Sequence, residues 1–193
     1  MEFIIHRVNL IEDLKKIPEE LGCEIDIRTD GSKLILNHEP FAKGDSFADY
    51  LDEYKNGTLV LNIKESGIED TVLKEVRLRG IKSYFLLDVE FPYLYNATKK
   101  GERNIAIRFS EKEPVESLNL FKDKLDWVWI DTISKFPVTI QNKHFFKDHK
   151  TCLVCPSRWG RSEDIPLYKK IFIERDYFPN SILTKQNLIK EWE

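Results

Sequence analysis

The chain has 193 residues, of which 41% are hydrophobic and 33% are charged. This length and this mixture predict one globular domain and exclude a disordered, collagen-like or low-complexity chain. Thirty Lys and Arg stand against 33 Asp and Glu, which leaves a net charge of −3. Because no run of five like charges occurs, we expect no nucleic-acid partner. No apolar stretch approaches the roughly 20 residues of a membrane span, and the N-terminus lacks the basic region of a secretory signal, so we expect a cytoplasmic protein.

The cysteines are few and odd in number, namely Cys23, Cys152 and Cys155. They cannot all form disulfides within one chain, which favours a reducing compartment. Cys152 and Cys155 make a C-x-x-C motif, but the apolar residues between them predict a strand, in which side chains three apart point to opposite faces. We therefore interpret both as small buried hydrophobic residues rather than zinc ligands.

Short apolar and β-branched runs alternate with helical patterns along the chain. The predicted strands are residues 3–7, 23–28, 59–64, 84–89, 105–109, 127–130, 151–155 and 181–184. Between the first two strands the apolar residues have helical spacing, and Asn9 with Glu12 predicts a capping box at the start of that helix. Further helices are predicted at residues 47–54 and 68–76 and near Pro92 and Pro114, whereas residues 134–150 predict a short helix or a loop.

Strands that alternate with helices predict a parallel sheet with helical crossovers, and eight such units imply an α/β fold of the (β/α)8 TIM-barrel type. The repeat averages about 24 residues, which is short for such barrels. We therefore expect a compact barrel in which some outer helices are abbreviated. An open, doubly wound sheet is the alternative, but that fold normally has a glycine-rich turn after its first strand, and residues 6–9 contain no glycine.

Chemistry in a barrel of this kind sits at the carboxyl ends of the strands. The first predicted strand closes with His6 and Arg7, and the second carries Glu24, Asp26 and Arg28 on one face. Two inward carboxylates stay charged in an apolar interior only beside a cation or within a hydrogen-bond network. Oxygen ligands in this number suit Mg²⁺ or Ca²⁺, although an ion network with the two arginines is an alternative that the sequence leaves open.

The histidines favour the same region of the chain. Asp30 and Gly31 predict a tight turn, after which an extended run over residues 33–36 returns His38 toward the acidic strand. His6 and His38 thus flank one acidic strand, and a histidine in such a place is suited to proton transfer near neutral pH.

Taken in order, these strand-end residues form a recognisable pattern. The motifs are His6-Arg7, Glu24-Ile25-Asp26 after Gly22, the turn Thr29-Asp30-Gly31, His38, and Leu61-Asn62-Ile63-Lys64 on the third strand. They resemble the glycerophosphodiester phosphodiesterase family, most strongly over residues 3–64. The resemblance implies a phospholipase C-like phosphodiesterase TIM barrel that forms one domain over residues 1–193.

The resemblance also implies a reaction and a site. The implied activity is that of a phosphoric diester hydrolase acting on a glycerophosphodiester-like or other small-molecule or glycan phosphodiester. The implied site residues are His6 and His38 as the acid–base pair, Glu24, Asp26 and Asn62 around a divalent metal ion (Mg²⁺ or Ca²⁺), and Arg7 and Lys64 near the phosphate. We assign to His38 the proton donation to the departing alkoxide. The chemistry agrees, because arginine grips phosphoryl oxygens with parallel hydrogen bonds and lysine supplies a point charge.

Two departures from the family pattern bear on activity. Val8 stands where the family usually has glycine, and we expect a β-branched residue there to crowd the site. Asn62 stands where a third acidic metal ligand is expected. Its carbonyl adds no charge, so we expect weak ion binding unless Asp88 or Glu90 substitutes. A catalytically impaired barrel that binds a phosphate or sugar phosphate is therefore the alternative function, and a phospho-sugar isomerase on the same barrel is a third.

The later strand ends carry polar residues without assigned roles. We expect Arg108 to pair with Glu111. The loop of residues 157–161 contains Trp159 and two arginines, which suit either a phosphate or sugar surface or a structural loop. His144 and His149 lie in the weakly helical stretch, where we expect both to be exposed.

Overall fold

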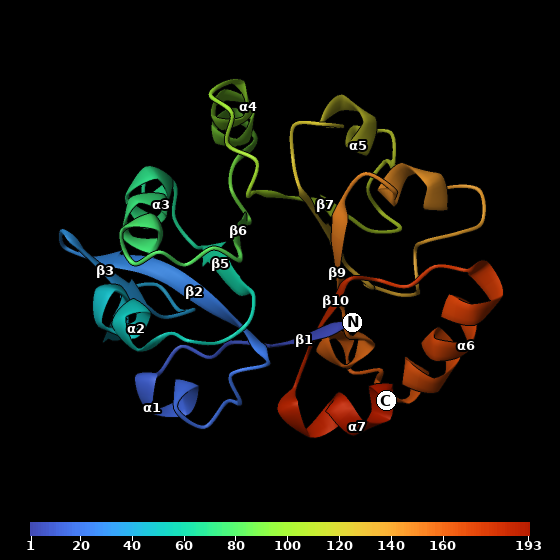
Figure 1. Ribbon diagram of the computed structural model, residues 1–193, viewed down its shortest axis with the longest axis horizontal. Helices are drawn as coiled ribbons and strands as arrows, with labels where there is room; N and C mark the ends of the chain where they lie inside the picture. Colours follow the sequence, from blue (N-terminus) through green and yellow to red (C-terminus); the bar gives the residue numbers. More distant parts are fainter. The chain divides into compact units, whose positions relative to one another are not determined.

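The computed structural model describes all 193 residues and divides them into two compact units. The N-terminal unit is Ile4–Asn96, and the C-terminal unit combines Met1–Phe3 with Ala97–Glu193. Each unit alternates strands with helices along the chain, as the labels and colours of Figure 1 show. No helix in either unit has the length and apolar character that a membrane crossing requires.

The N-terminal unit is built on a mixed sheet. Its strands are β1 (Glu2–Ile5), β2 (Gly22–Asp30), β3 (Lys33–Leu36), β4 (Asp45–Ser46), β5 (Leu59–Ile63) and β6 (Tyr84–Leu87), and its helices are α1 (Ile11–Leu14), α2 (Phe47–Glu53), α3 (Glu69–Leu78) and α4 (Phe91–Lys99). The ends of β1 and α4 that lie outside Ile4–Asn96 belong to the other unit. The β1–β2, β2–β5 and β5–β6 pairs are parallel, whereas β3 is antiparallel to both β2 and β4.

The long strand β2 organises this sheet. Cys23 lies opposite both Ile5 of β1 and a residue of β5, and Ile27 lies opposite both Leu36 of β3 and a residue of β5. β1 and β3 therefore follow one another along the same side of β2, with β5 on its other side. The carboxyl ends of β1 and β3 consequently point toward each other along β2, with the residues between Cys23 and Ile27 between them.

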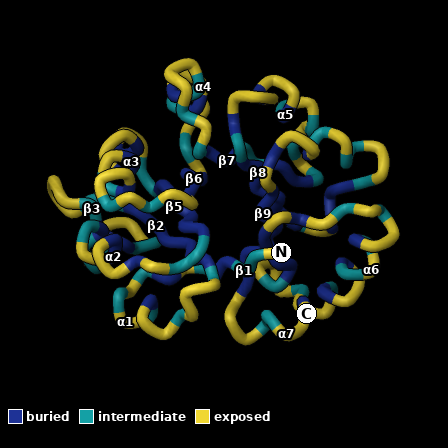
Figure 2. Tube along the Cα trace, viewed as in Figure 1, coloured by how far each residue is buried: buried dark blue, intermediate teal, exposed yellow.

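The core of the N-terminal unit lies around its parallel strands. All of β5 and the first six residues of β2 are buried, as expected for parallel strands covered on both faces. The apolar faces that the sequence predicted for α2 and α3 are also buried, through Phe47, Tyr50 and Leu51 and through Val72, Leu73 and Val76. In Figure 2 these strands are dark blue, while exposed positions are concentrated on the helices and turns.

The C-terminal unit contains a parallel sheet in the order β7-β8-β9-β10. Its strands are β7 (Ala106–Phe109), β8 (Trp127–Ile130), β9 (Lys150–Val154) and β10 (Ser181–Thr184), its α-helices are α5 (Ser117–Leu120), α6 (Ile165–Arg175) and α7 (Ile189–Trp192), and its short 3₁₀ helices are η1 (Lys143–Phe146), η2 (Pro156–Trp159), η3 (Ser162–Asp164) and η4 (Gln186–Leu188). In its core, the Phe136 ring lies 5.4 Å from the rings of both Tyr168 and Phe172. The packing of α6 thus depends largely on aromatic contacts.

The predicted strands are all present, with small shifts at their ends, and the extended run over residues 33–36 is β3. The first helix is shorter than predicted, and its predicted capping box is wrong. Its N-cap is Leu10, without a side-chain cap, because Asn9 is bonded to Asp26 instead. Within residues 134–150 only the single turn η1 forms, so that stretch is mostly a loop.

Two further expectations concern buried residues. The predicted exposure of His149 is wrong: this side chain is buried, and its Nδ1 lies 2.9 Å from the Leu125 carbonyl oxygen. Cys152 and Cys155 are buried and form no disulfide, so their interpretation as small core residues is confirmed. The α/β organisation is also confirmed, whereas the closure of the strands into one barrel domain over residues 1–193 stays a prediction.

Candidate functional site

The polar side chains predicted for the site come together in the N-terminal unit. The register of β2 with β5 places Asp26 opposite Asn62. The turn after β1 is fixed against β2, because the Val8 N–H donates to the Glu24 carbonyl at 2.8 Å. His6 leaves β1 in this turn, so residues from β1, β2 and β5 meet at one edge of the sheet.

A pair of buried carboxylates forms the centre of the candidate site. Glu24 and Asp26 project from the same face of β2 and are each 1% exposed. Asn62 links them, since its Nδ2 donates to Glu24 Oε1 at 2.8 Å and to Asp26 Oδ1 at 3.3 Å. The other amide atom, Asn62 Oδ1, is buried and has no hydrogen-bond partner. One amide group therefore bridges the two acids and keeps an unused oxygen beside them.

Arg7 adopts a strained backbone conformation at this turn. Its φ of 61° lies in the left-handed region, which costs a residue other than glycine about 1 kcal/mol or more. The Arg7 N–H donates to Glu24 Oε2 at 2.8 Å, and its Nε lies 3.5 Å from Asp26 Oδ2. The position that would favour glycine is thus Arg7 rather than Val8, whose side chain is buried in the core.

Lys64 is a second cation beside the acid pair. Its Nζ lies 3.3 Å from Asp26 Oδ1 and 3.8 Å from Asp88 Oδ2. The sequence also allowed an ion pair between Arg28 and the two acids. Arg28 instead donates to the backbone carbonyls of His38 and Lys64. Arg7 and Lys64 are therefore the cations that face the acids, and Asp88 is the later strand-end acid that approaches them.

Asn9 belongs to the site, although the sequence reading assigned it to a helix cap. Its Nδ2 donates to Asp26 Oδ2 at 2.9 Å, and its Oδ1 accepts the Asp26 N–H at 2.8 Å. This reciprocal pair fixes both the carboxylate of Asp26 and the loop after β1. Its place three residues after His6, at the end of a strand, is the signal that could have indicated this role.

The surroundings of the acid pair disfavour the charged form of Glu24. The pKa of Glu24 is raised to about 7, first because burial disfavours the charged carboxylate and second because the charge of Asp26 is close. The hydrogen bonds from Asn62 and from the Arg7 N–H, together with the charge of Lys64, lower this pKa without cancelling the increase. Burial and the neighbouring acid thus disfavour the charged form of Glu24 in spite of the donors and cations around it.

The two histidines differ in their surroundings. His6 Nε2 lies 3.9 Å from Glu24 Oε2, and the side chain is 20% exposed. The main chain before His38 returns to β2 as predicted, because the Asn37 N–H donates to the Asp26 carbonyl at 3.0 Å. The His38 ring, however, contacts its neighbour Glu39, with Nδ1 2.7 Å from Oε1. His6 is thus beside the acid pair, whereas His38 reaches the same edge through its backbone.

The residues fit an oxygen-bound divalent ion through the Asn62 amide. No group of three histidine, cysteine or acidic side chains is arranged to hold a metal ion. The polar side chain that could add an oxygen beside Glu24 and Asp26 is Asn62. A half-turn of the Asn62 amide would exchange its unpartnered Oδ1 for the Nδ2 that now contacts both carboxylates. The three oxygens would then form a set that suits Mg²⁺ or Ca²⁺.

The strand ends of the C-terminal unit present a different arrangement. Asp131, which follows β8, is 5% exposed. Its Oδ1 accepts hydrogen bonds from the Thr132 N–H and from Trp159 Nε1, and its Oδ2 accepts one from Arg108, each at 2.8 Å. Arg108, which we expected to pair with Glu111, thus pairs with Asp131. The indole of Trp159 is held in place by the same carboxylate.

By sequence, the chain matches no protein-family profile. No curated protein is significantly similar to it in sequence. Its fold, however, is similar to that of solved structures. A glycerophosphoryl diester phosphodiesterase from Parabacteroides distasonis ATCC 8503 matches with a TM-score of 0.62 at 13% identity, over 94% of this chain and 81% of the other. A glycerophosphodiester phosphodiesterase from Agrobacterium tumefaciens str. C58 matches with a TM-score of 0.63 at 12% identity, over 95% of this chain and 96% of the other.

At this level of identity the similarity concerns the fold. The chain has the α/β fold that these glycerophosphodiester phosphodiesterases share, which confirms the predicted resemblance at the level of architecture. The roles of individual residues rest on their geometry and chemistry.

Proposed function

We propose that the chain is a divalent-ion-dependent phosphodiesterase, a phosphoric diester hydrolase that acts on a glycerophosphodiester-like, small-molecule or glycan diester. The observation that carries this proposal is the buried acid pair Glu24 and Asp26, which meets His6, Arg7 and Lys64 at one edge of the sheet. Paired acids, phosphate-binding cations and a histidine are the groups that metal-assisted phosphodiester hydrolysis needs.

The proposal includes the architecture and the compartment. The fold shared with two glycerophosphodiester phosphodiesterases supports closure of the strands into a compact (β/α)8 barrel over residues 1–193. The three cysteines are buried and form no disulfide, which supports a reducing compartment, and we propose the cytoplasm.

Arg7 and Lys64 would bind the phosphate. The Arg7 side chain is 39% exposed, so its guanidinium is accessible to a ligand while Nε faces Asp26. Two parallel hydrogen bonds from this group would orient the phosphoryl oxygens. Lys64 is 17% exposed and stands between Asp26 and Asp88, which holds its ammonium as a fixed point charge for the same anion.

The histidines would move the protons. His6 would take the proton from the attacking hydroxyl, which in a glycerol diester is the neighbouring hydroxyl of glycerol. As the new P–O bond forms, the bond to the leaving alkoxide breaks and His38 gives that oxygen a proton. Water would then open the resulting cyclic phosphate. Each histidine has a carboxyl group beside it that can orient its ring, Glu24 for His6 and Glu39 for His38.

Glu24, Asp26 and Asn62 are the residues that would hold the divalent ion, which would offset the negative charge on the phosphoryl oxygens as a Lewis acid. Two carboxylates only balance the charge of such an ion, so binding should be weaker than at a site with three acids. The alternative function, an impaired barrel that binds a phosphate or sugar phosphate, is favoured by one observation: the donor side of the Asn62 amide faces both carboxylates.

A substrate panel separates the two functions. The purified chain would be assayed against glycerophosphodiesters, nucleotide-linked sugars and a chromogenic phosphodiester, with Mg²⁺, Mn²⁺ or Ca²⁺ and with a chelator. We expect turnover of at least one substrate, loss of turnover with chelator, and loss in the isosteric variant Glu24→Gln. No detectable turnover of any substrate, together with measurable phosphate binding, would favour the impaired barrel. Turnover that survives both the chelator and Glu24→Gln would refute the proposed site.

A further inference from the structure

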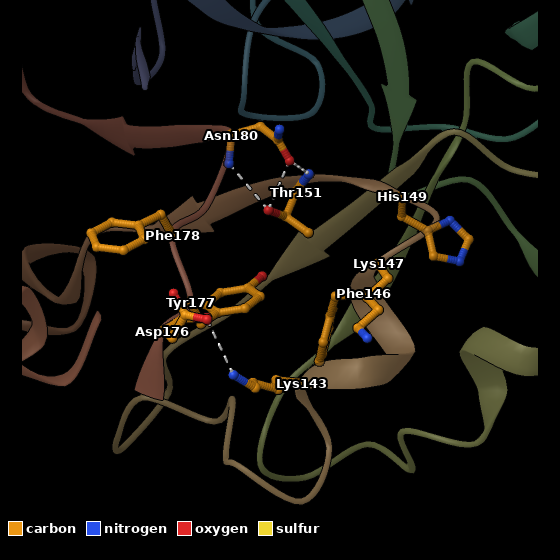
Figure 3. A pocket seen from close by; sticks show the side chains of 9 residues that line it. All are labelled: Lys143, Phe146, Lys147, His149, Thr151, Asp176, Tyr177, Phe178 and Asn180. Carbon is orange, nitrogen blue, oxygen red and sulfur yellow. Dashed lines mark hydrogen bonds and ion pairs between the residues drawn. The ribbon is translucent and has the colours of Figure 1, made fainter. Parts of the chain in front are cut away.

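A cavity in the C-terminal unit lies at the amino end of its sheet. Its volume is about 400 Å³, which is within the range of small-molecule sites. Figure 3 shows the nine side chains that line it. They come from η1 and the residues after it, from Thr151 near the start of β9, and from the chain that leads from α6 to Asn180, directly before β10. The strand-end residues of the candidate phosphodiesterase site, by contrast, lie at carboxyl ends.

Aromatic rings form one side of this cavity. Phe146 is 3% exposed, and the Tyr177 ring meets it edge-on with the centroids 5.8 Å apart. Phe178 is 61% exposed and so presents its ring at the rim. The left-handed residue Asp176 ends α6 and turns the chain back, so that the Tyr177 N–H donates to the Phe172 carbonyl at 3.0 Å. The chain thus presents adjacent rings against which a flat apolar group can pack.

The charges of the lining are mostly positive. Lys143 and Lys147 are its two lysines, and Asp176 is its one acidic residue. Lys143 is anchored, with Nζ 2.8 Å from the Arg175 carbonyl oxygen and 3.7 Å from the Asp176 carboxylate, which is 92% exposed. Lys147 is exposed and forms no ion pair. The ammonium group of Lys147 is therefore the cation of the lining that remains available to an anionic ligand.

A buried donor also lines the cavity. The Tyr177 hydroxyl is buried and has no hydrogen bond of ordinary geometry. Burial raises the pKa of Tyr177, and the nearby Thr151 hydroxyl lowers it only in part, so the phenol stays a proton donor. The Thr151 hydroxyl is itself 3.2 Å from Asn180 Oδ1. A buried hydroxyl without a well-formed hydrogen bond is costly, and a movement of the Tyr177 ring that opens the hydroxyl to the cavity would let an acceptor of the ligand satisfy it.

We propose that this cavity binds a small aromatic anion, an aryl carboxylate or aryl phosphate, whose ring packs against Phe146, Tyr177 and Phe178 and whose acidic group meets Lys147 and the Tyr177 hydroxyl. The proposal combines the three features of the lining, namely adjacent rings, surplus positive charge and an unpaired donor. It is independent of the proposed phosphodiesterase function, because every residue it uses belongs to the C-terminal unit.

Calorimetric titration of the full chain tests this binding, with phenyl phosphate, benzoate and inorganic phosphate as probes. We expect saturable one-site binding of at least one aromatic probe, and the aromatic probe that binds more tightly identifies the preferred anion. Inorganic phosphate should bind to this cavity at least about tenfold more weakly, because it has no ring. Phosphate binding that Arg7→Gln removes belongs to the candidate phosphodiesterase site and is not counted. Lys147→Glu should raise the Kd of the aromatic probe about tenfold or more, and Tyr177→Phe should raise it about two- to tenfold.

Lys190→Glu on α7 is the matched control, since it makes the same change of net charge at an exposed lysine outside the cavity lining. It should leave the Kd within about twofold of the parent value. The proposal is overturned if neither aromatic probe binds, or if Lys147→Glu weakens binding no more than Lys190→Glu does. It is also overturned if phenyl phosphate binding persists in Lys147→Glu but disappears in Arg7→Gln, because the ligand would then occupy the candidate phosphodiesterase site.

Discussion

Both units bury carboxylates near the carboxyl ends of parallel strands, yet the two places differ in how the acids are compensated. Asp131 of the C-terminal unit receives three short hydrogen bonds, distributed over both of its oxygens. Glu24 and Asp26 of the N-terminal unit share one amide, which has a buried oxygen without a partner, and the pKa of Glu24 is raised. Burial of one acid is thus a weak sign of function, whereas two adjacent buried acids beside an unpartnered amide oxygen favour a site for a ligand.

The largest expected effect separates a reacting histidine from a structural one. His6→Ala should lower turnover by about 10² to 10⁴ while changing the free energy of unfolding by less than about 1 kcal/mol. His149→Ala should do the reverse, because it removes the hydrogen-bond partner of the buried Leu125 carbonyl: a loss of about 1–3 kcal/mol in stability and unchanged turnover per folded molecule. Steady-state kinetics and denaturant unfolding on both variants check this pair. A fully active His6→Ala variant would contradict the proposed role of His6 in proton transfer.

Neutralising one acid in each unit should shift stability in opposite directions. Glu24→Gln should raise the ion-free unfolding free energy at pH 8, because it removes a buried charge. The new amide oxygen can still accept the Arg7 N–H, and after a half-turn of the Asn62 amide the new amide nitrogen can donate to Asn62 Oδ1. Asp131→Asn should lower it by about 1–3 kcal/mol, since an amide cannot accept from all the donors that now face the carboxylate. Urea unfolding in the presence of chelator measures both changes. If both variants lose stability equally, the proposed difference between the surroundings of Glu24 and those of Asp131 is wrong.

The raised pKa of Glu24 predicts how ion-free stability depends on pH. Between the ordinary pKa of an unfolded glutamate and about 7, the folded state binds more protons than the unfolded state. The contribution of Glu24 to the unfolding free energy should therefore decrease as pH rises from 5 to 8, by an amount on the order of 2 kcal/mol. Unfolding curves across this range should show a steeper decline for the parent chain than for Glu24→Gln. Identical slopes would mean that Glu24 is already charged at pH 5.

A smaller effect concerns the strained turn after β1. Arg7→Gly and Arg7→Ala both remove the cation, but only glycine adopts the left-handed φ without strain. We expect Arg7→Gly to be more stable than Arg7→Ala by about 1 kcal/mol. Both variants should bind phosphate more weakly than the parent chain does. Thermal unfolding and phosphate titration test the two statements separately, and equal stability of the variants would show that the backbone at this position carries no strain.

The strands and the acid pair could be predicted from sequence because they depend on local patterns. The apolar runs identify each strand, and alternation along β2 places Glu24 and Asp26 on one face. The errors depend on contacts between residues distant in sequence. Asn9 has the pattern of a helix cap but bonds to Asp26, seventeen positions later. The buried His149 contacts the Leu125 carbonyl, twenty-four positions earlier.

Other features of the site depend on turn geometry that the sequence does not reveal. The left-handed conformation falls on Arg7, one residue before the position at which glycine was expected. The His38 backbone reaches the predicted edge, but its ring pairs with the adjacent Glu39. Spacing along the chain predicts which residues meet, whereas the direction of each side chain after a turn requires the three-dimensional structure.

The central claim is that the acid pair of the N-terminal unit forms an incomplete site for a divalent ion. Calorimetric titration of Mg²⁺ and Ca²⁺ into the parent chain and into Asn62→Asp tests it most directly. A third carboxylate at nearly constant volume should tighten binding about tenfold or more and should destabilise the ion-free chain, because three acids then repel one another. Affinity that is unchanged by Asn62→Asp, or the absence of binding to both proteins, would contradict the claim.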